Sequence, residues 1–281
     1  MPEGPEIRRM VDAIDTAVGG REARAVHFAF ERLKGFESAL SGRRVIGVAA
    51  RGKAVLVTFA ARGDDGQWCV YSHNQLYGQW RVGHADKPPA TTRQLRFAII
   101  GAERAARLYS ASDIRLVRPD SLGEIPYLAR LGPDPLNDAA IDHACLYRQF
   151  DDPRFRGRAL GGLLLDQAFV AGIGNYLRSE ILFEAALHPL RKPRTLGAEE
   201  RTALAAAIVC LIERAYRLKG ITNDPERAAE LKRQGQRFAQ RRHMVFNRAG
   251  HACYICRTPI DRTTVASRRL YLCPVCQPCP A

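Results

Sequence analysis

The chain has 281 residues, enough for two domains with separate cores, and 46% of them are hydrophobic, as in ordinary globular proteins. No apolar run reaches the length of a membrane span and the N-terminus lacks a signal-peptide pattern, so we expect a cytoplasmic protein without a membrane partner. The formal net charge of +14 favours a polyanionic partner, nucleic acid before membrane.

The first six residues combine a processing signal with two reactive groups. Methionine aminopeptidases remove Met1 before a small residue, so the mature chain is expected to begin with the secondary amine of Pro2. An α-amine has a pKa near ~8, which leaves an uncharged nucleophilic fraction at neutral pH, and Glu3 lies beside it as a proton donor. The alternative is that Pro2 is only tolerated before a helix and Glu3 complements the helix dipole.

The N-terminal half is predicted to be one helix followed by a β-rich domain. Residues 5–18 carry apolar side chains at helical spacing, and Gly19-Gly20 ends that helix. Strand-like runs follow at residues 26–30, 43–48, 54–59, 68–72, 79–82, 95–100 and 104–110. Many short strands at close spacing predict a β-sandwich or a barrel.

The character of the sequence changes at the stiff segment 131–136, after which helical patterns dominate. We expect helices from behind Asn137 to about Phe150 and over about 160–168, 175–186 and 198–218, followed by a basic stretch at 227–248. The predicted fold is therefore α+β. Its domains are a catalytic β-sandwich domain at 1–131, a helical domain at 132–247 and a cysteine-bearing module at 248–281.

A tight double turn, Ala171 to Gly174, separates the second and third predicted helices. Glycines there let the backbone approach a ligand, and the amides at the start of the next helix attract an anion. Asn175 is expected to be the N-cap of that helix. The turn then forms half of a phosphate clamp, although an ordinary capped helix hairpin has the same local pattern.

Two CxxC pairs, Cys253/Cys256 and Cys273/Cys276, lie sixteen residues apart. This spacing lets four thiolates surround one structural zinc ion, with a β-hairpin at 263–272 between the pairs. Cys279 forms a second CxxC with Cys276 and leaves an alternative pair open. The zinc would fold a segment too small for its own core and hold Arg268, near the hairpin tip, where it suits a phosphate.

The other cysteines have no partner by spacing. Cys69, Cys145 and Cys210, together with Cys279 if it does not bind the metal, are interpreted as small buried hydrophobes or idle thiols rather than as disulfides.

Six motifs in one order carry a family resemblance. They are MPEGPEIRR at the start, RGKAVL at 51–56, YSHNQLYGQWRV at 71–82, LYSASDI at 108–114, LLLDQAFVAGIGNYLRSEIL at 163–182, and the four-cysteine finger. Together they resemble the bacterial formamidopyrimidine-DNA glycosylase/endonuclease VIII family of base-excision repair enzymes, on the endonuclease VIII side. The resemblance fades over about residues 214–247. It implies a helix–two-turn–helix domain between the β-sandwich and a zinc-bound hairpin.

The resemblance also implies catalytic roles. Pro2 would attack the sugar carbon of a damaged nucleotide and form a Schiff base, with Glu3 as proton donor. Lys53 would donate a proton in β-elimination, and Arg268 would contact a phosphate and donate in δ-elimination. Glu6 lies one turn from Glu3 and is expected either to shape the pocket or to complement the helix dipole.

Further residues are expected to bind DNA because they match family positions. His73, Asn175, Arg268 and Lys53 would grip phosphates, and Arg178 belongs to the same motif as Asn175. Gln75, Leu76 and Tyr77 would form the wedge that fills the gap left by the extruded nucleotide, which offsets part of the cost of flipping.

The sequence therefore predicts a bifunctional DNA glycosylase and abasic-site lyase that excises oxidised bases, pyrimidines favoured, from damaged double-stranded DNA. We expect a monomer with one structural Zn²⁺ and no organic cofactor, located in the bacterial cytoplasm at the nucleoid. The alternatives are a purine-directed enzyme of the formamidopyrimidine type and a non-catalytic damage-binding protein. Since Pro2, Glu3 and Lys53 are all present, the non-catalytic alternative is disfavoured.

Overall fold

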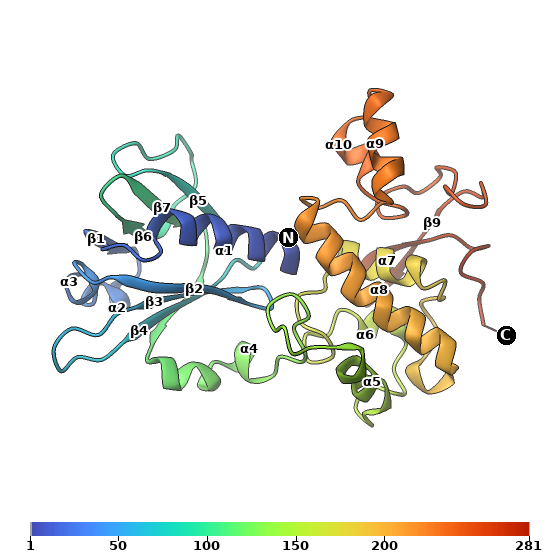
Figure 1. The fold of residues 1–281 in the computed structure, drawn as a ribbon, viewed down its shortest axis with the longest axis horizontal. Helices are drawn as coiled ribbons and strands as arrows, with labels where there is room; N and C mark the ends of the chain where they lie inside the picture. Colours follow the sequence, from blue (N-terminus) through green and yellow to red (C-terminus); the bar gives the residue numbers. More distant parts are fainter. Residues whose placement is uncertain (1, 281) are drawn as a thin grey trace. The chain divides into compact units, whose positions relative to one another are not determined.

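The computed structural model describes residues 2–280, which form two compact units (Figure 1). One unit comprises Pro2 and Ile7–Arg130, and the other comprises Glu3–Glu6 together with residues 131–280. The second unit therefore includes a short N-terminal segment that a division at residue 131 alone would assign to the first.

The first unit contains two four-stranded antiparallel sheets, of order β1-β6-β7-β5 and β2-β3-β4-β8. The strands are β1 (Ala25–Phe28), β2 (Val45–Arg51), β3 (Ala54–Phe59), β4 (Trp68–His73), β5 (Gln79–His84), β6 (Leu95–Ile100), β7 (Arg104–Tyr109) and β8 (Asp113–Val117). The predicted β-sandwich is confirmed. Strand β8 was not predicted; it is a short strand that pairs with β4 and carries charged Asp113 and Arg115 among its five residues.

Helix α1 (Gly4–Val18) confirms the predicted N-terminal helix. Its apolar side chains Ile7, Val11 and Ile14 are buried in one core with residues of both sheets, among them Phe28 and Val57. Short helical segments complete the unit: α2 (Glu31–Lys34), α3 (Glu37–Leu40), η1 (Pro119–Glu124) and α4 (Pro126–Ala129).

The hairpin between β2 and β3 positions Lys53. The last paired residues of the ladder are Arg51 and Ala54, which leaves Gly52 and Lys53 as a two-residue turn. Gly52 has a φ of +57°, a conformation that glycine adopts without the steric cost borne by other residues. Two-residue turns with glycine first match the twist of the strands and so fix the direction of the turn.

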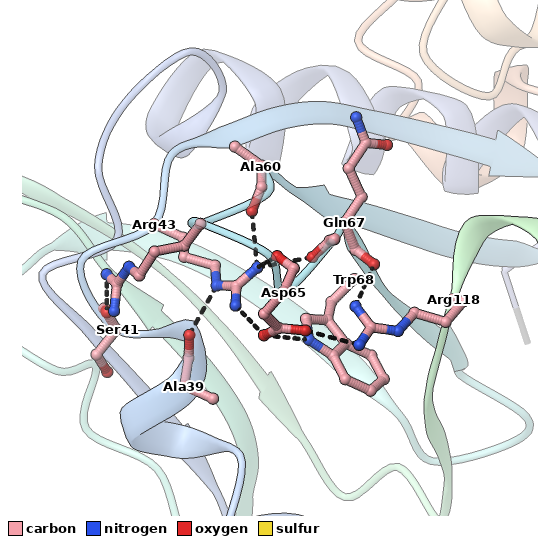
Figure 2. A network of polar contacts seen from close by, with 10 residues as sticks. Ala39, Ser41, Arg43, Ala60, Asp65, Gln67, Trp68 and Arg118 are labelled. Atoms are coloured by element: carbon pink, nitrogen blue, oxygen red, sulfur yellow. Dashed lines mark hydrogen bonds and ion pairs between the residues drawn. The ribbon is translucent and has the colours of Figure 1, made fainter.

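The loop between β3 and β4 is held by a polar network around Asp65 (Figure 2). The Asp65 carboxylate accepts hydrogen bonds from the Arg118 guanidinium at 2.6 Å and the Trp68 indole at 3.2 Å, and it pairs with Arg43. The buried Arg43 also donates to the carbonyls of Ala39 and Ala60. This network therefore connects α3, the end of β3 and the start of β4 to Arg118, which directly follows β8.

The second unit is mainly helical. Its helices are α5 (His143–Asp151), α6 (Leu160–Leu163), α7 (Asn175–Glu184), η2 (Pro193–Thr195), α8 (Ala198–Arg217), α9 (Pro225–Arg233) and α10 (Phe238–Arg241). Their core includes Phe150, Phe169, Leu177 and Ile208. No helix within residues 2–280 is both long and apolar enough to cross a membrane.

Two predicted helices are shorter than expected. The helix predicted from behind Asn137 begins at His143, because the Asp142 carboxylate accepts the Cys145 amide as N-cap and the preceding residues turn around Asp134. The helix predicted over 160–168 ends at Leu163. There the Asp166 carboxylate accepts the Ala168 amide and the Asp166 carbonyl accepts the Phe169 amide, which closes a turn instead.

Strands β9 (Asp261–Val265) and β10 (Arg268–Leu272) form the predicted C-terminal hairpin. Its turn residues Ala266 and Ser267 have φ values of +53° and +58°, as in a two-residue turn with both central residues left-handed. Leu270 and Leu272 of β10 are buried in the helical core, so the hairpin is anchored to the second unit.

The network around Asp65 predicts a pH-dependent contribution to stability. Its hydrogen bonds, first that from Arg118, lower the pKa of Asp65 to about 2, below the value of ~3.9 for an unfolded aspartate. The contribution is therefore present above pH ~4 and is lost as the pH falls through about 2. We expect Asp65→Asn to lower the melting temperature at pH 7. Near pH 2 the melting temperatures of the variant and the wild type should become similar.

Thermal unfolding between pH 2 and 7 measures this difference, with the exposed neighbour Asp64→Asn as the matched control. A difference between Asp65→Asn and wild type that is constant over this pH range would contradict the assignment.

Candidate active site

The Glu3 carboxylate caps helix α7. It accepts hydrogen bonds from the backbone amides of Gly174 at 2.7 Å, Tyr176 at 2.8 Å and Leu177 at 3.2 Å, and the residue is 4% exposed. The first amides of a helix have no partner within the helix and carry partial positive charge, so a carboxylate is well suited to this place. Three backbone amides therefore hold the Glu3 carboxylate in place.

The prediction that Asn175 is the N-cap is wrong. Gly174 occupies that position and Asn175 is the first helical residue, since the carboxylate of Glu3 takes the amides that a capping side chain would accept. A Cβ atom on Gly174 would lie 2.3 Å from the Glu3 carboxyl carbon, so this close approach requires glycine.

The residues next to Glu3 are also anchored. The Gly4 amide donates to the Gly172 carbonyl at 2.8 Å, and the Glu3 amide donates to the Glu6 carboxylate at 3.0 Å. Glu6 in turn accepts the Tyr176 hydroxyl at 3.1 Å and lies 3.9 Å from Arg242. Pro2 is half-buried and directly precedes this fixed segment.

Arg178 is buried and organises the hairpin. Its guanidinium donates to the carbonyls of Gly161 at 2.8 Å and Arg269 at 3.0 Å and to the Asn175 side chain at 2.7 Å. Burial lowers its pKa to about 10, so it stays charged at neutral pH. The residue is 0% exposed, and its bonds hold the Asn175 side chain and the hairpin backbone. Arg268 is exposed at the start of β10.

In the first unit, Lys53 and His73 both contact Tyr127. The Lys53 amide donates to the Tyr127 hydroxyl at 2.8 Å, and Lys53 is 9% exposed. The His73 ring meets the Tyr127 ring edge to face, with centroids 4.8 Å apart. His73 Nδ1 accepts the Gln75 amide at 3.0 Å, which assigns the imidazole proton to Nε2, and burial lowers its pKa and favours the neutral ring.

The proposed wedge residues lie in the loop between β4 and β5. Leu76 and Tyr77 are 64% and 72% exposed, unusually high for large apolar side chains. Gln75 has a φ of +50°, and its side-chain oxygen accepts the Ser112 hydroxyl at 2.7 Å. The loop is thus fixed at its base while it presents two apolar side chains to solvent.

Four cysteines gather at the C-terminal hairpin. The sulfur atoms of Cys253, Cys256, Cys273 and Cys276 all lie within 4.8 Å of one another. The Cys253–Cys276 and Cys256–Cys273 separations are 3.9 and 3.3 Å, close to the ~3.8 Å edge of a tetrahedron with metal–sulfur bonds of ~2.3 Å. The residues fit a four-thiolate metal site, and Cys279, which is exposed, does not belong to this cluster.

Comparisons with known proteins identify the family. The formamidopyrimidine-DNA glycosylase N-terminal domain matches residues 1–116, and the H2TH domain of the same family matches residues 131–226. Two curated relatives named Endonuclease 8, from Enterobacter sp. (strain 638) and Shigella sonnei (strain Ss046), are 44% and 43% identical over 277 residues. These cover 99% of this chain and 100% of each relative. The chain belongs to the formamidopyrimidine-DNA glycosylase/endonuclease 8 family.

Members of this family are DNA glycosylases with abasic-site lyase activity. The fold is shared with Lactococcus lactis Fpg in a complex with DNA that contains an abasic site, at a TM-score of 0.78 and 20% identity over 98% of this chain and 99% of that one. A complex of the same Lactococcus lactis protein with DNA that contains an oxidised pyrimidine also has a TM-score of 0.78, at 21% identity over 99% of this chain and 100% of that one.

Glu180, a buried carboxylate in α7, was assigned no role from the sequence. It accepts the Thr222 hydroxyl at 2.7 Å and the amides of Met244 at 2.8 Å, Val245 at 2.9 Å and Phe246 at 2.8 Å. Burial raises its pKa, and these four donors oppose that shift. Glu180 thus ties the residues on both sides of 223–242 to α7. Its local sequence carries no signal for these partners.

We expect Glu180→Gln to lower the free energy of unfolding by about 2–4 kcal/mol, because an amide turns a donor toward backbone amides that need an acceptor. Urea unfolding measures the effect. Glu184→Gln, on the same helix but 37% exposed in its side chain, serves as the control and should change stability by less than ~0.5 kcal/mol. Equal effects of the two substitutions would contradict this role of Glu180.

Proposed function

We propose that this chain is a bifunctional DNA glycosylase and abasic-site lyase of base excision repair, acting on oxidised pyrimidines. The observation that carries the proposal is the anchored N-terminal segment, in which Glu3 caps α7 and places Pro2 at the start of a fixed backbone. Full-length identity of 43–44% to proteins named Endonuclease 8 favours the pyrimidine-directed activity over the purine-directed one.

In the proposed reaction, the Pro2 nitrogen forms a bond to the sugar carbon that carries the damaged base, and the bond from that carbon to the base breaks. Glu3 relays two protons, the one lost by the Pro2 nitrogen and a second taken up from water, to the departing base and to the opened sugar oxygen. The resulting iminium makes the neighbouring carbon acidic, so loss of a proton there expels the 3′ phosphate, and a second elimination expels the 5′ phosphate.

Lys53 and Arg268 are the proposed proton donors of the first and second elimination. Lys53 lies on the fixed turn between β2 and β3, and Arg268 follows the hairpin turn of the second unit. Both are also proposed phosphate contacts, as are His73, through its Nε2–H, and Asn175.

The wedge proposed for the extruded nucleotide is Gln75, Leu76 and Tyr77. Their support is the exposure of Leu76 and Tyr77 on a loop whose base is fixed, because an apolar group that enters the base stack must be available before DNA binds.

A zinc ion is the proposed metal of the four-cysteine cluster. Thiolates at tetrahedral spacing suit zinc, and since all four positions are filled by protein the ion would be structural. We further propose three parts, 1–131, 132–247 and 248–281, in a protein that acts as a cytoplasmic monomer, associates with the nucleoid and uses no organic cofactor.

The proposed chemistry is tested by borohydride trapping on DNA that contains an abasic site. We expect a covalent complex with the mature protein, weaker trapping with Pro2→Gly, and none when an uncleaved residue precedes Pro2, because its nitrogen is then an amide. A known lyase serves as the positive control. Absence of trapping by the mature protein, or undiminished trapping by the blocked chain, would overturn the proposal.

A panel of duplexes with single lesions tests the substrate class. We expect faster cleavage of duplexes that contain an oxidised pyrimidine than of those that contain a formamidopyrimidine or 8-oxoguanine. The reverse order would favour the purine-directed alternative.

The metal assignment predicts one zinc ion per chain, lost in Cys273→Ser and retained in Cys279→Ser. Loss of the ion should unfold the hairpin that carries Arg268 and weaken DNA binding about tenfold or more, since these small modules fold only with their metal. Elemental analysis and a DNA-binding titration measure both effects. Zinc retained in Cys273→Ser and lost in Cys279→Ser would show that Cys276 and Cys279 form the second pair instead.

A further inference from the structure

Tyr127 is a residue that neither the sequence motifs nor the proposed reaction uses. It lies in the short helix α4, and its ring packs on a small core of the first unit that contains Ala54, Leu56 and Tyr71. The neighbouring Ile125, the N-cap of α4, is 2% exposed and belongs to the same core. The ring is therefore held in place by packing, independently of its hydroxyl group.

The Tyr127 hydroxyl accepts the backbone amide of Lys53 at 2.8 Å. Lys53 lies outside the ladder of β2 and β3, whose last pair is Arg51 and Ala54, and only 9% of the residue is exposed. A buried amide at such a place needs an acceptor from elsewhere in the fold, and leaving it without one is costly. The hydroxyl thus fixes the backbone from which the Lys53 side chain projects.

The same tyrosine borders the proposed DNA contacts. Its ring meets the edge of His73 with centroids 4.8 Å apart, and His73 Nδ1 accepts the Gln75 amide at the base of the wedge loop. One side chain thus contacts both the turn that carries Lys53 and the histidine that fixes the start of the loop. The two contacts use different parts of Tyr127, the hydroxyl for Lys53 and the ring for His73.

We propose that Tyr127 is a positioning residue of the lyase reaction, with its hydroxyl fixing Lys53 for proton transfer and its ring fixing His73. This assignment rests on the proposed role of Lys53. It predicts that the two functions separate: removal of the hydroxyl slows elimination, and removal of the ring also weakens DNA binding.

The test uses the full-length protein under single-turnover conditions on duplex DNA with one abasic site. Tyr127→Phe removes only the hydroxyl. It should slow strand cleavage about tenfold, because small displacements of a catalytic group cost that much or more, while the borohydride-trapped fraction stays unchanged and the dissociation constant for DNA rises less than in Tyr127→Ala. Tyr127→Ala should in addition raise the dissociation constant.

Tyr147→Phe is the matched control, since it removes a tyrosine hydroxyl of the other unit, one that donates to the Ala198 carbonyl in an exposed hydrogen bond. It should cleave at the wild-type rate. The decisive comparison is a double-mutant cycle: in a Lys53→Ala background, Tyr127→Phe should have no further effect, because the group that it positions is absent.

Three results would overturn the proposal. They are wild-type cleavage by Tyr127→Phe, an equal slowing by Tyr127→Phe with and without Lys53, and an equal slowing by Tyr147→Phe. If the wild-type protein itself neither traps nor cleaves, the proposed function fails and the assignment of Tyr127 falls with it, so the two failures are distinguished by the wild type alone.

Discussion

The bonds from the Glu3 carboxylate to the start of helix α7 are the constraint on which the account of this protein depends. Three backbone amides of the helical unit converge on a carboxylate from the third residue of the chain. A helix N-terminus supplies these donors at no cost in side-chain order, and the carboxylate satisfies groups that would otherwise be buried without partners. The same hydrogen bonds to Glu3 therefore cap helix α7 and hold the backbone next to Pro2, the proposed nucleophile.

The same principle recurs in both units, where side chains of the proposed site are fixed by bonds to backbone groups. Arg178 donates to the Gly161 and Arg269 carbonyls, and Tyr127 accepts the amide of Lys53. Such contacts are made by groups that are themselves held by secondary structure, so they fix position more firmly than pairs of flexible surface side chains would. The arginines behind the net charge of +14 therefore do not all have the same role. Arg178 is buried and stabilises the fold, whereas Arg268 is exposed to solvent.

Local patterns in the sequence predicted what depends on local physics. Strands β3 and β6 and the ends of helix α8 follow from apolar runs bounded by turn residues, and the metal cluster follows from the spacing of Cys253, Cys256, Cys273 and Cys276. Family resemblance supplied the site residues, whose roles remain predictions.

The features that were missed have partners far away in the sequence. The carboxylate that caps α7 comes from Glu3, which is distant in the sequence. Asn175 was predicted to be the N-cap because only its sequence neighbours were considered. Glu180 and Tyr127 were overlooked because the hydrogen-bond partners named for them lie 42 to 74 residues away in the sequence. Arg178, polar and within a motif, gave no sign of its burial. Periodicity and motif spacing do not predict hydrogen bonds between a side chain and a backbone group that is distant in the sequence.

The central claim is that the amine of Pro2, held by Glu3, is the nucleophile. Its most direct test is to digest the borohydride-reduced complex with DNA and to locate the sugar adduct by mass spectrometry. The account predicts an adduct on the N-terminal peptide, on the nitrogen of Pro2, with Met1 absent. An adduct on Lys53 or on another lysine would contradict it.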